Sequence, residues 1–184
     1  MKGEVRVVTS NEHKFAELKD LSGHKVRLVR IDSPKLEIQA DSLEEIVRYS
    51  AVTFFSLFRF PLIVEDSGLF IEALNGFPGP YTNYVKRTLD NEGILKLMNG
   101  IENRRAIFRS VIGYIDVERL ELFKGEINGH IGDKAEGDKG FGFDPIFIPN
   151  GYNISFAQMD LKEKNLISHR SQAFREFLRF YEKI

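Results

Sequence analysis

The sequence contains no cysteine among its 184 residues. This absence excludes disulfide bonds and thiolate chemistry, and with only four histidines it also argues against a zinc site. No charge of one sign prevails either, because 26 Lys and Arg against 27 Asp and Glu give a formal net charge of -1. The chain therefore has no global positive field to hold duplex nucleic acid or an anionic membrane. A polyanionic ligand must be bound by a local site.

A long hydrophobic run is also missing. The longest apolar block, Ala51 to Val64, is interrupted by Arg59 and is shorter than the roughly 20 residues that a membrane-spanning helix needs. The first apolar stretch carries Glu4 and Arg6, so a signal peptide is not expected. These features predict a cytoplasmic protein that binds neither membranes nor nucleic acid.

Apolar residues are nevertheless plentiful, at 42% of the chain with 16 Phe, and a chain of this length buries roughly 70% of its surface on folding. Strand-like and helix-like patterns alternate without a linker or repeat, which predicts one α/β domain over residues 1–184 with a mixed sheet. The expected strands cover 5–9, 25–31, 61–65, 69–73, 105–115, 119–127 and 145–148. The expected helices cover 12–21, 43–58, 81–98 in two pieces, a segment capped by Asp160 to Glu163, and a last one through 173–181.

The first segment that could bind a ligand or take part in catalysis is Thr9-Ser10-Asn11-x-x-Lys14. It lies where a strand is expected to end and a helix to begin. The backbone N–H groups and positive dipole of a helix start attract phosphate, and Lys14 adds a point charge one turn later. The alternative is an ordinary Asn or Ser cap beside a solvated lysine. No GxxxxGK[ST] pattern occurs, so a Walker-type phosphate loop is excluded.

A second segment places two adjacent carboxylates, Glu65 and Asp66, at the expected end of an apolar strand before Ser67 and Gly68. Isolated buried charge is costly, and a hard cation would relieve that cost. Mg²⁺ takes oxygen ligands and often bridges one or two carboxylates to substrate phosphates, so Glu37, Glu65 and Asp66 are candidate ligands. The alternative is a strand end that Asp66 caps by hydrogen bonding into the turn.

Two further segments offer aromatic faces and hydrogen-bond donors. Gly140-Phe141-Gly142-Phe143-Asp144-Pro145 could stack a base on its rings, or could enter the core as a glycine-kinked strand. Lys164-Asn165-x-x-Ser168-His169-Arg170 gathers cations, a hydroxyl and an imidazole that could grip an anion or the keto edge of a base. The alternative is a helix start capped by Ser168 with surface charges.

Together and in this order, these segments resemble the inosine/xanthosine triphosphate pyrophosphatases, the Ham1-like family. The resemblance spans nearly the whole chain and is carried by five stretches: Thr9 to Glu17, Glu37 to Asp41, Glu65 to Tyr81, Phe141 to Pro145, and Glu163 to Arg170. It implies a two-lobed α/β fold around a long twisted mixed sheet, with the active site in the cleft between lobes. It also implies a homodimer that requires Mg²⁺, with Mn²⁺ as a substitute.

The implied reaction is hydrolysis of ITP, dITP and XTP to the monophosphate and pyrophosphate, by attack of water at the α-phosphorus. By the resemblance, Asn11 and Lys14 bind the triphosphate, and the rest of their segment, Thr9 and Ser10, is expected to contribute to the same site. We assign Asp66 as the catalytic residue that orients the water. Glu37, Glu65 and Asp66 hold the metal. The base end of the substrate is assigned to Ser67, Phe141, Phe143, Asp144, Lys164, Ser168, His169 and Arg170.

Two other functions remain open from the sequence. A Maf-like pyrophosphatase for modified pyrimidine nucleotides would share the phosphate and metal ends and differ only at the base end. A non-catalytic nucleotide sensor would use the same aromatic and basic groups for binding alone, and the replacement Asp66→Asn would then leave ligand affinity intact. The three carboxylates facing a polyphosphate favour the enzyme.

Overall fold

The computed structural model describes residues 2–184 except residues 24, 35 and 37. Its strands are β1 (Lys2–Val8), β2 (Val26–Ile31), β3 (Leu62–Ile71), β4 (Pro78–Gly79), β5 (Arg105–Ile115), β6 (Leu120–Ile131) and β7 (Phe147–Pro149). Its α-helices are α1 (Glu12–Ser22), α2 (Leu43–Phe58), α3 (Thr82–Thr88), α4 (Asp90–Leu97), α5 (Leu161–Ile167) and α6 (His169–Tyr181). Two short 3₁₀ helices are η1 (Glu72–Leu74) and η2 (Asp144–Ile146).

Within the described residues the strands form one seven-stranded mixed sheet with the order β2-β1-β3-β5-β6-β7, and β4 pairs with β3. β1 runs parallel to both β2 and β3, whereas β4 and β7 pair antiparallel with their neighbours. A parallel neighbour requires a crossover connection, and α1 and α2 supply the two crossovers at β1. The predicted α/β class with a mixed sheet is confirmed.

The chain divides into two compact units. The first, unit 1, comprises Met1–Asp66, Ser110–Gly125 and His169–Ile184, and the second, unit 2, comprises Ser67–Arg109 and Glu126–Ser168. Each unit has a hydrophobic core of its own. The core of unit 1 joins β1, α1 and α6 through residues such as Val7, Leu18 and Phe177. The core of unit 2 includes Phe108, Phe147 and Phe156, whose rings pack with centroids 4.7 to 6.1 Å apart.

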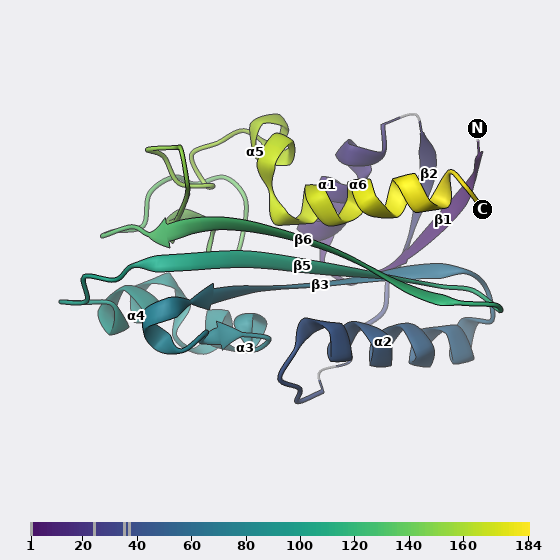
Figure 1. The fold of residues 1–184 in the computed structure, drawn as a ribbon, viewed down its shortest axis with the longest axis horizontal. Helices are drawn as coiled ribbons and strands as arrows, with labels where there is room; N and C mark the ends of the chain where they lie inside the picture. The colour runs from purple at the N-terminus through teal and green to yellow at the C-terminus, as the bar shows by residue number, and fades with distance from the viewer. Residues whose placement is uncertain (1, 24, 35, 37) are drawn as a thin grey trace. The chain divides into compact units, whose positions relative to one another are not determined.

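In unit 1, α2 and α6 cover opposite faces of the sheet (Figure 1). Two glycines show how closely these layers pack. A Cβ at Gly113 of β5 would lie 2.6 Å from Val47 of α2, and a Cβ at Gly125 of β6 would lie 2.1 Å from the carbonyl oxygen of His169 in α6. Both strands therefore need glycine where a helix crosses them.

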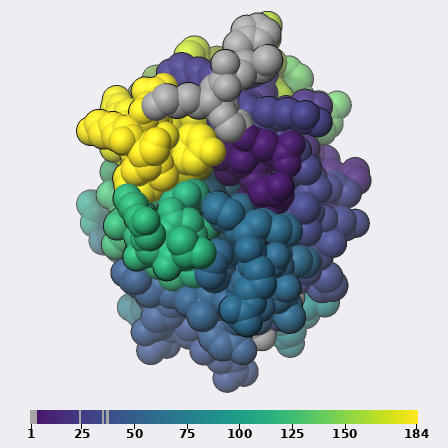
Figure 2. Space-filling model, turned by 90° about the vertical axis from the view of Figure 1, so that its right-hand side faces the viewer, coloured from purple at the N-terminus to yellow at the C-terminus, as the bar shows by residue number. Residues whose placement is uncertain are grey.

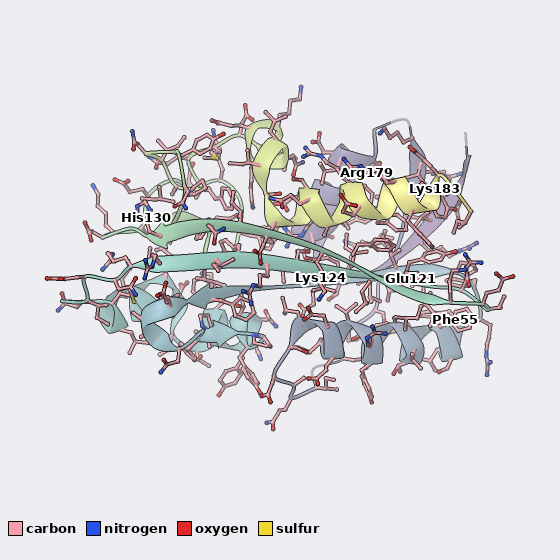
Figure 3. All side chains as sticks on the ribbon, viewed as in Figure 1. Phe55, Glu121, Lys124, His130, Arg179 and Lys183 are labelled. Carbon is pink, nitrogen blue, oxygen red and sulfur yellow. The ribbon has the colours of Figure 1, made fainter. Side chains whose placement is uncertain are left out.

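The amphipathic pattern of α6 explains its place. Its buried residues Ala173, Phe174, Phe177 and Leu178 recur at helical spacing, whereas Arg179 and Lys183 are exposed, as Figure 3 shows. The C-terminal residues reach the turn between β5 and β6, and Figure 2 shows them beside it. No helix in the part of the chain that the structure describes has the length and apolarity needed to cross a membrane.

Capping residues fix several helix starts that the sequence predicts. The side chains of Asn11, Ser42 and Asp160 accept hydrogen bonds from the backbone N–H three residues later, at 3.0, 3.3 and 2.7 Å. Ser168 directly precedes α6, at the position where the sequence allows a cap, but it is fully buried and not at the surface.

Two strand predictions are also wrong in detail. Residues 61–65 and 69–73 were expected as separate strands around a turn at Asp66-Ser67-Gly68, but β3 runs without a break from Leu62 to Ile71. The strand expected over 145–148 begins later, because η2 occupies Asp144–Ile146. In addition, β6 continues to Ile131, beyond the expected end at residue 127.

Candidate active site

Five charged side chains of unit 1 gather where α1, β3 and α6 meet, and all but one are almost fully buried. Lys14 and Glu17 come from α1, Glu65 and Asp66 from β3, and Arg170 from the first turn of α6. We call this set the charged cluster. Its members are 1 to 4% exposed except for Lys14, whose side chain retains 14% exposure. Three carboxylates therefore face two cations.

Ion pairs connect the charged cluster. Lys14 Nζ lies 2.9 Å from Glu65 Oε2 and 3.5 Å from Asp66 Oδ1. Arg170 Nε donates to Glu65 Oε1 at 3.2 Å, and Arg170 Nη1 donates to Glu17 Oε2. The hydroxyl of Ser110, on β5, donates to Glu65 Oε1 at 2.7 Å. Glu65 is the centre of the cluster.

The ionisation of Glu65 follows from these neighbours. Burial by itself would raise the pKa of this carboxyl, but the positive charges of Arg170 and Lys14 and the hydrogen bonds from Ser110 and Lys14 outweigh burial and hold the pKa far below its ordinary value. Glu65 is therefore ionised at neutral pH. Lys14 and Arg170 in turn are held in place by a permanent negative charge.

The approach to the charged cluster is the start of α1. The backbone N–H of Asn11 donates to Thr9 Oγ1 at 3.1 Å, and Asn11 Oδ1 accepts from the N–H of Lys14 at 3.0 Å. Thr9 and Asn11 are half-buried and Ser10 is exposed. The positive end of the helix dipole and the ammonium of Lys14 therefore lie within one turn of each other, which is an arrangement that favours phosphate.

The carboxylates of this site are the type of ligand that a divalent cation takes. Mg²⁺ is commonly bound by one or two carboxylates together with substrate phosphates and water. Asp66 and Glu65 are such a pair, although the oxygens of Glu65 already contact Lys14, Arg170 and Ser110. Glu37 lies outside the described residues, and among those described no group of three or more His, Cys, Asp or Glu side chains gathers as a metal site.

A second group of predicted residues lies in unit 2. Lys164 Nζ donates to Asp144 Oδ2 at 2.6 Å, and the same oxygen accepts the backbone N–H of Phe141 at 2.9 Å. The ammonium also lies 5.1 Å from the centre of the Phe141 ring, a cation–π distance. This Asp144–Lys164 pair is about 3% exposed and fixes the loop that carries Phe141.

Several of the predicted base-binding residues are buried. Phe143 is only 1% exposed and belongs to the core of unit 2, which agrees with the alternative of a glycine-kinked entry to the core. Ser168, His169 and Arg170 are also buried, so the alternative of surface charges does not hold for them, and their role at the base stays a prediction. In unit 1, Nε and Nη1 of Arg170 donate to the carboxylates of Glu65 and Glu17. Ser67 is half-buried within β3.

Sequence reasoning did not assign a role to Glu17 or Ser110. Glu17 follows Lys14 by three residues and so shares its face of α1, which is a readable signal. Ser110 stands beside Val111 and Ile112 in an otherwise apolar part of β5. A buried serine there needs a hydrogen-bond partner, but the sequence does not identify Glu65 as that partner.

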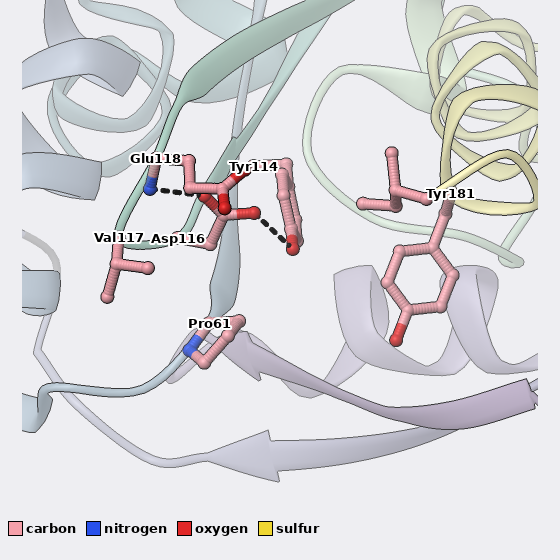
Figure 4. A pocket seen from close by; sticks show the side chains of 7 residues that line it. Pro61, Tyr114, Asp116, Val117, Glu118 and Tyr181 are labelled. Atoms are coloured by element: carbon pink, nitrogen blue, oxygen red, sulfur yellow. Dashed lines mark hydrogen bonds between the residues drawn. The ribbon is translucent and has the colours of Figure 1, made fainter.

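A separate cavity of about 500 Å³ lies in unit 1 at the turn between β5 and β6 (Figure 4). Tyr114 donates its hydroxyl to Asp116 Oδ2 at 3.0 Å, and burial together with this neighbour raises the pKa of Tyr114. The lining residues are Pro61, Tyr114, Asp116, Val117, Glu118, Tyr181 and Ile184. None of the predicted site residues lines this cavity.

Comparisons with known proteins identify the family of this chain. The sequence profile of the Ham1 family matches residues 5–180. The chain belongs to the Ham1 family. A dITP/XTP pyrophosphatase of Saccharolobus solfataricus is 48% identical over 180 residues, which cover 97% of this chain and 94% of that protein. A protein of the same name from Methanopyrus kandleri is 49% identical over 97% of this chain and 96% of its own length.

Solved structures of Ham1 proteins share the fold. The HAM1 protein from Coxiella burnetii superposes with a TM-score of 0.85 at 26% identity, over 98% of this chain and 100% of that one. The Staphylococcus aureus Ham1 protein superposes with a TM-score of 0.81 at 27% identity, over 97% and 98% of the two chains. The family resemblance predicted from the motifs is thus confirmed.

Proposed function

We propose that this chain hydrolyses the non-standard purine nucleoside triphosphates ITP, dITP and XTP to the monophosphate and pyrophosphate. Relatives named dITP/XTP pyrophosphatase cover almost the whole chain at 48 and 49% identity. The observation in the structure that carries the proposal is the contact of Lys14 with both Glu65 and Asp66 at the start of α1. A phosphate-binding helix start and a carboxylate that can orient water then lie in one place.

In the proposed reaction the start of α1 and Lys14 bind the triphosphate. Asp66 accepts a hydrogen bond from the attacking water and directs it at the α-phosphorus, while Lys14 neutralises charge that develops on the leaving pyrophosphate. Asp66 and Glu37 are the proposed ligands of a divalent cation, with Mg²⁺ preferred and Mn²⁺ as a substitute. When bound, such a cation lowers the pKa of its water and shields the phosphate oxygens.

We assign recognition of the base to unit 2, at Phe141 and the Asp144–Lys164 pair. Hypoxanthine and xanthine carry a keto oxygen where adenine carries an amino group. A fixed hydrogen-bond donor of the protein can therefore bind the keto oxygen of the non-standard bases. The same donor would face the amino group, which is another donor, if the base were adenine. The ring of Phe141 supplies a stacking face beside the ammonium of Lys164.

The test is a turnover assay with Mg²⁺ and separate ITP, XTP, GTP, ATP and the pyrimidine nucleotide dUTP, which resolves pyrophosphate from orthophosphate. We expect pyrophosphate from ITP and XTP, and rates with GTP and ATP that are lower by orders of magnitude. Asp66→Asn should lower kcat by about 10² to 10⁴, the usual contribution of a positioned general base. Asp20→Asn, an exposed carboxylate on α1, is the matched control and should leave kcat unchanged.

The other outcomes decide between functions. If pyrophosphate is released from a pyrimidine triphosphate instead, the result would favour a Maf-like pyrophosphatase. It would also contradict the assignment of the base site to Phe141 and the Asp144–Lys164 pair. Absence of turnover with every triphosphate, with tight binding that Asp66→Asn does not weaken, would favour a nucleotide sensor. We further propose that the protein is a cytoplasmic homodimer. Light scattering of the purified chain would test the dimer by measuring its mass in solution.

A further inference from the structure

Glu65 uses its two carboxylate oxygens for two different purposes. Oε1 accepts from Ser110 Oγ at 2.7 Å and from Arg170 Nε at 3.2 Å, whereas Oε2 lies 2.9 Å from Lys14 Nζ. One oxygen is thus anchored to the protein interior, and the other faces the lysine that leads to the proposed phosphate site. The side chain of Glu65 is 3% exposed, so water does not compete freely for these positions.

The anchored oxygen determines where Lys14 lies. A carboxylate is planar, so hydrogen bonds that fix Oε1 also fix the direction of Oε2. Lys14 is a point charge on a flexible four-carbon stem and has no preferred direction of its own. Held by Oε2, its ammonium lies 3.5 Å from Asp66 Oδ1. The position of the ammonium therefore depends on the orientation of Glu65.

We propose that Ser110 is a positioning residue for the reaction, because its hydrogen bond to Glu65 directs Glu65 to hold Lys14 beside Asp66. This inference rests on the proposed function, in which Lys14 binds the triphosphate. Ser110 is fully buried, so in this proposal it acts through Glu65 and not by contact with the substrate. Glu65 in this scheme positions Lys14 and is not a metal ligand.

Ser110 offers a clean experiment because it carries no charge. Ser110→Ala removes one hydrogen bond to Glu65 and leaves the number of charges in the cluster unchanged. Arg170 still contacts Oε1, so Glu65 remains paired but can turn more freely. Lys14 then spends less time in the position that binds phosphate.

The test is a double-mutant cycle of the full chain with Ser110→Ala, Lys14→Met and the two combined. Two quantities are measured with ITP: kcat/KM with Mg²⁺, and the Kd in EDTA by titration calorimetry. We expect Ser110→Ala alone to lower kcat/KM and to raise Kd by about fivefold, as for loss of one hydrogen bond. In the Lys14→Met background the same replacement should change kcat/KM by less than about twofold, because the two residues act in one network.

Two further variants separate positioning from general damage. Ser110→Thr keeps the hydroxyl and should recover most of the kcat/KM that Ser110→Ala loses. Ser155→Ala is the matched control, since Ser155 is a buried serine of unit 2 that donates to the carbonyl oxygen of Glu136 at 2.6 Å. It should lower the Tm and leave kcat/KM unchanged. If Ser110→Ala does not fold, Ser110→Cys, whose thiol is slightly larger than the hydroxyl and a weaker donor, replaces it in the cycle.

The outcomes are distinguishable from failure of the proposed function. A wild-type chain that does not hydrolyse ITP would overturn the proposed function itself. A wild-type chain that hydrolyses ITP, with the same fold-loss from Ser110→Ala in the presence and absence of Lys14, would overturn only the role of Ser110. Failure of Ser110→Thr to recover activity would overturn it as well.

Discussion

Arg170 shows what a single residue contributes at this site. Its guanidinium is 1% exposed and pairs with Glu17 and Glu65, which are also buried. Arg170→Met would leave both carboxylates without this cation, and breaking a buried pair costs about 3 to 5 kcal/mol. We expect a decrease of that size in the free energy of unfolding, measured by urea denaturation at an unchanged m-value.

An exposed arginine provides the control for Arg170. Arg105 donates two hydrogen bonds to Glu72 at 2.6 and 2.8 Å, but both side chains are more than half exposed to water. Water solvates both charges when such a pair is broken. Arg105→Met should therefore leave the urea midpoint nearly unchanged. Equal losses from the two variants would show that burial does not set the importance of Arg170.

Residue types and spacing identified candidate side chains at the proposed phosphate end, but did not predict which contacts they make. Lys14, Glu65 and Asp66 were expected to act together, and the structure places Lys14 Nζ 2.9 Å from a carboxylate oxygen of Glu65 and 3.5 Å from one of Asp66. Arg170 was expected to donate to a base, because its guanidinium presents fixed donors and the family resemblance assigns its segment to the base end. Its burial between two carboxylates depends on the packing of α6 against α1, which one sequence does not reveal.

At the scale of elements, the first turn of α6 depends on a glycine in β6. A Cβ on Gly125 would lie 2.1 Å from the carbonyl oxygen of His169 and 2.6 Å from the backbone nitrogen of Ala173. Gly125→Ala must therefore push α6 away from the strand and carry Arg170 with it. We expect a loss of about 1 to 3 kcal/mol in the free energy of unfolding, as for overpacked cores, and a lower kcat/KM with ITP.

Gly132 is the control for Gly125, because its nearest neighbour is the flexible tip of Ile148 at 3.3 Å. Gly132→Ala should cost less stability and leave kcat/KM unchanged. A Gly125→Ala variant with the stability and activity of the wild type would contradict the close packing of α6 on β6. Thermal denaturation and the ITP assay measure both quantities on the same samples.

The path of β3 shows why an element can be misread from sequence. Asp66, Ser67 and Gly68 are residues that favour turns, so the local pattern predicts a break. The strand continues because Gly68 can approach the carbonyl oxygen of Gly79 in β4, where a Cβ would lie at 2.4 Å. Asp66 thus belongs to the charged cluster, and Gly68 allows the close contact with β4. By contrast, α1, α2 and α5 begin at their predicted caps, because capping is local in sequence.

At the scale of the whole molecule, composition and periodicity predicted the α/β class, but they did not predict the division into two units. β3, β5 and β6 each contribute residues to both units, so no linker or change of composition marks the boundary. The two cores are nevertheless separate sets of residues. Long-range pairing of strands decides which apolar residues share a core, and a single sequence does not specify that pairing.

Separate cores predict separate responses to core mutations. Phe177 is fully buried in the core of unit 1, and Phe156 is fully buried in the core of unit 2. Replacing either by Leu removes part of a packed ring and should cost about 1 to 2 kcal/mol. If each core stabilises its own unit, Phe177→Leu should accelerate amide hydrogen exchange mainly in β1, α1 and α6, whereas Phe156→Leu should accelerate it mainly in α4, η2 and β7.

Hydrogen exchange followed by mass spectrometry distinguishes two separately stabilised units from a single cooperative unit. In a single unit both variants would accelerate exchange of the most protected amides in the two sets of elements to the same extent, because those amides exchange only on global unfolding. The comparison also bears on activity. Every described residue of the charged cluster belongs to unit 1, so loosening of unit 1 by Phe177→Leu should raise the KM for ITP through Lys14, whereas Phe156→Leu acts on the loop of Phe141.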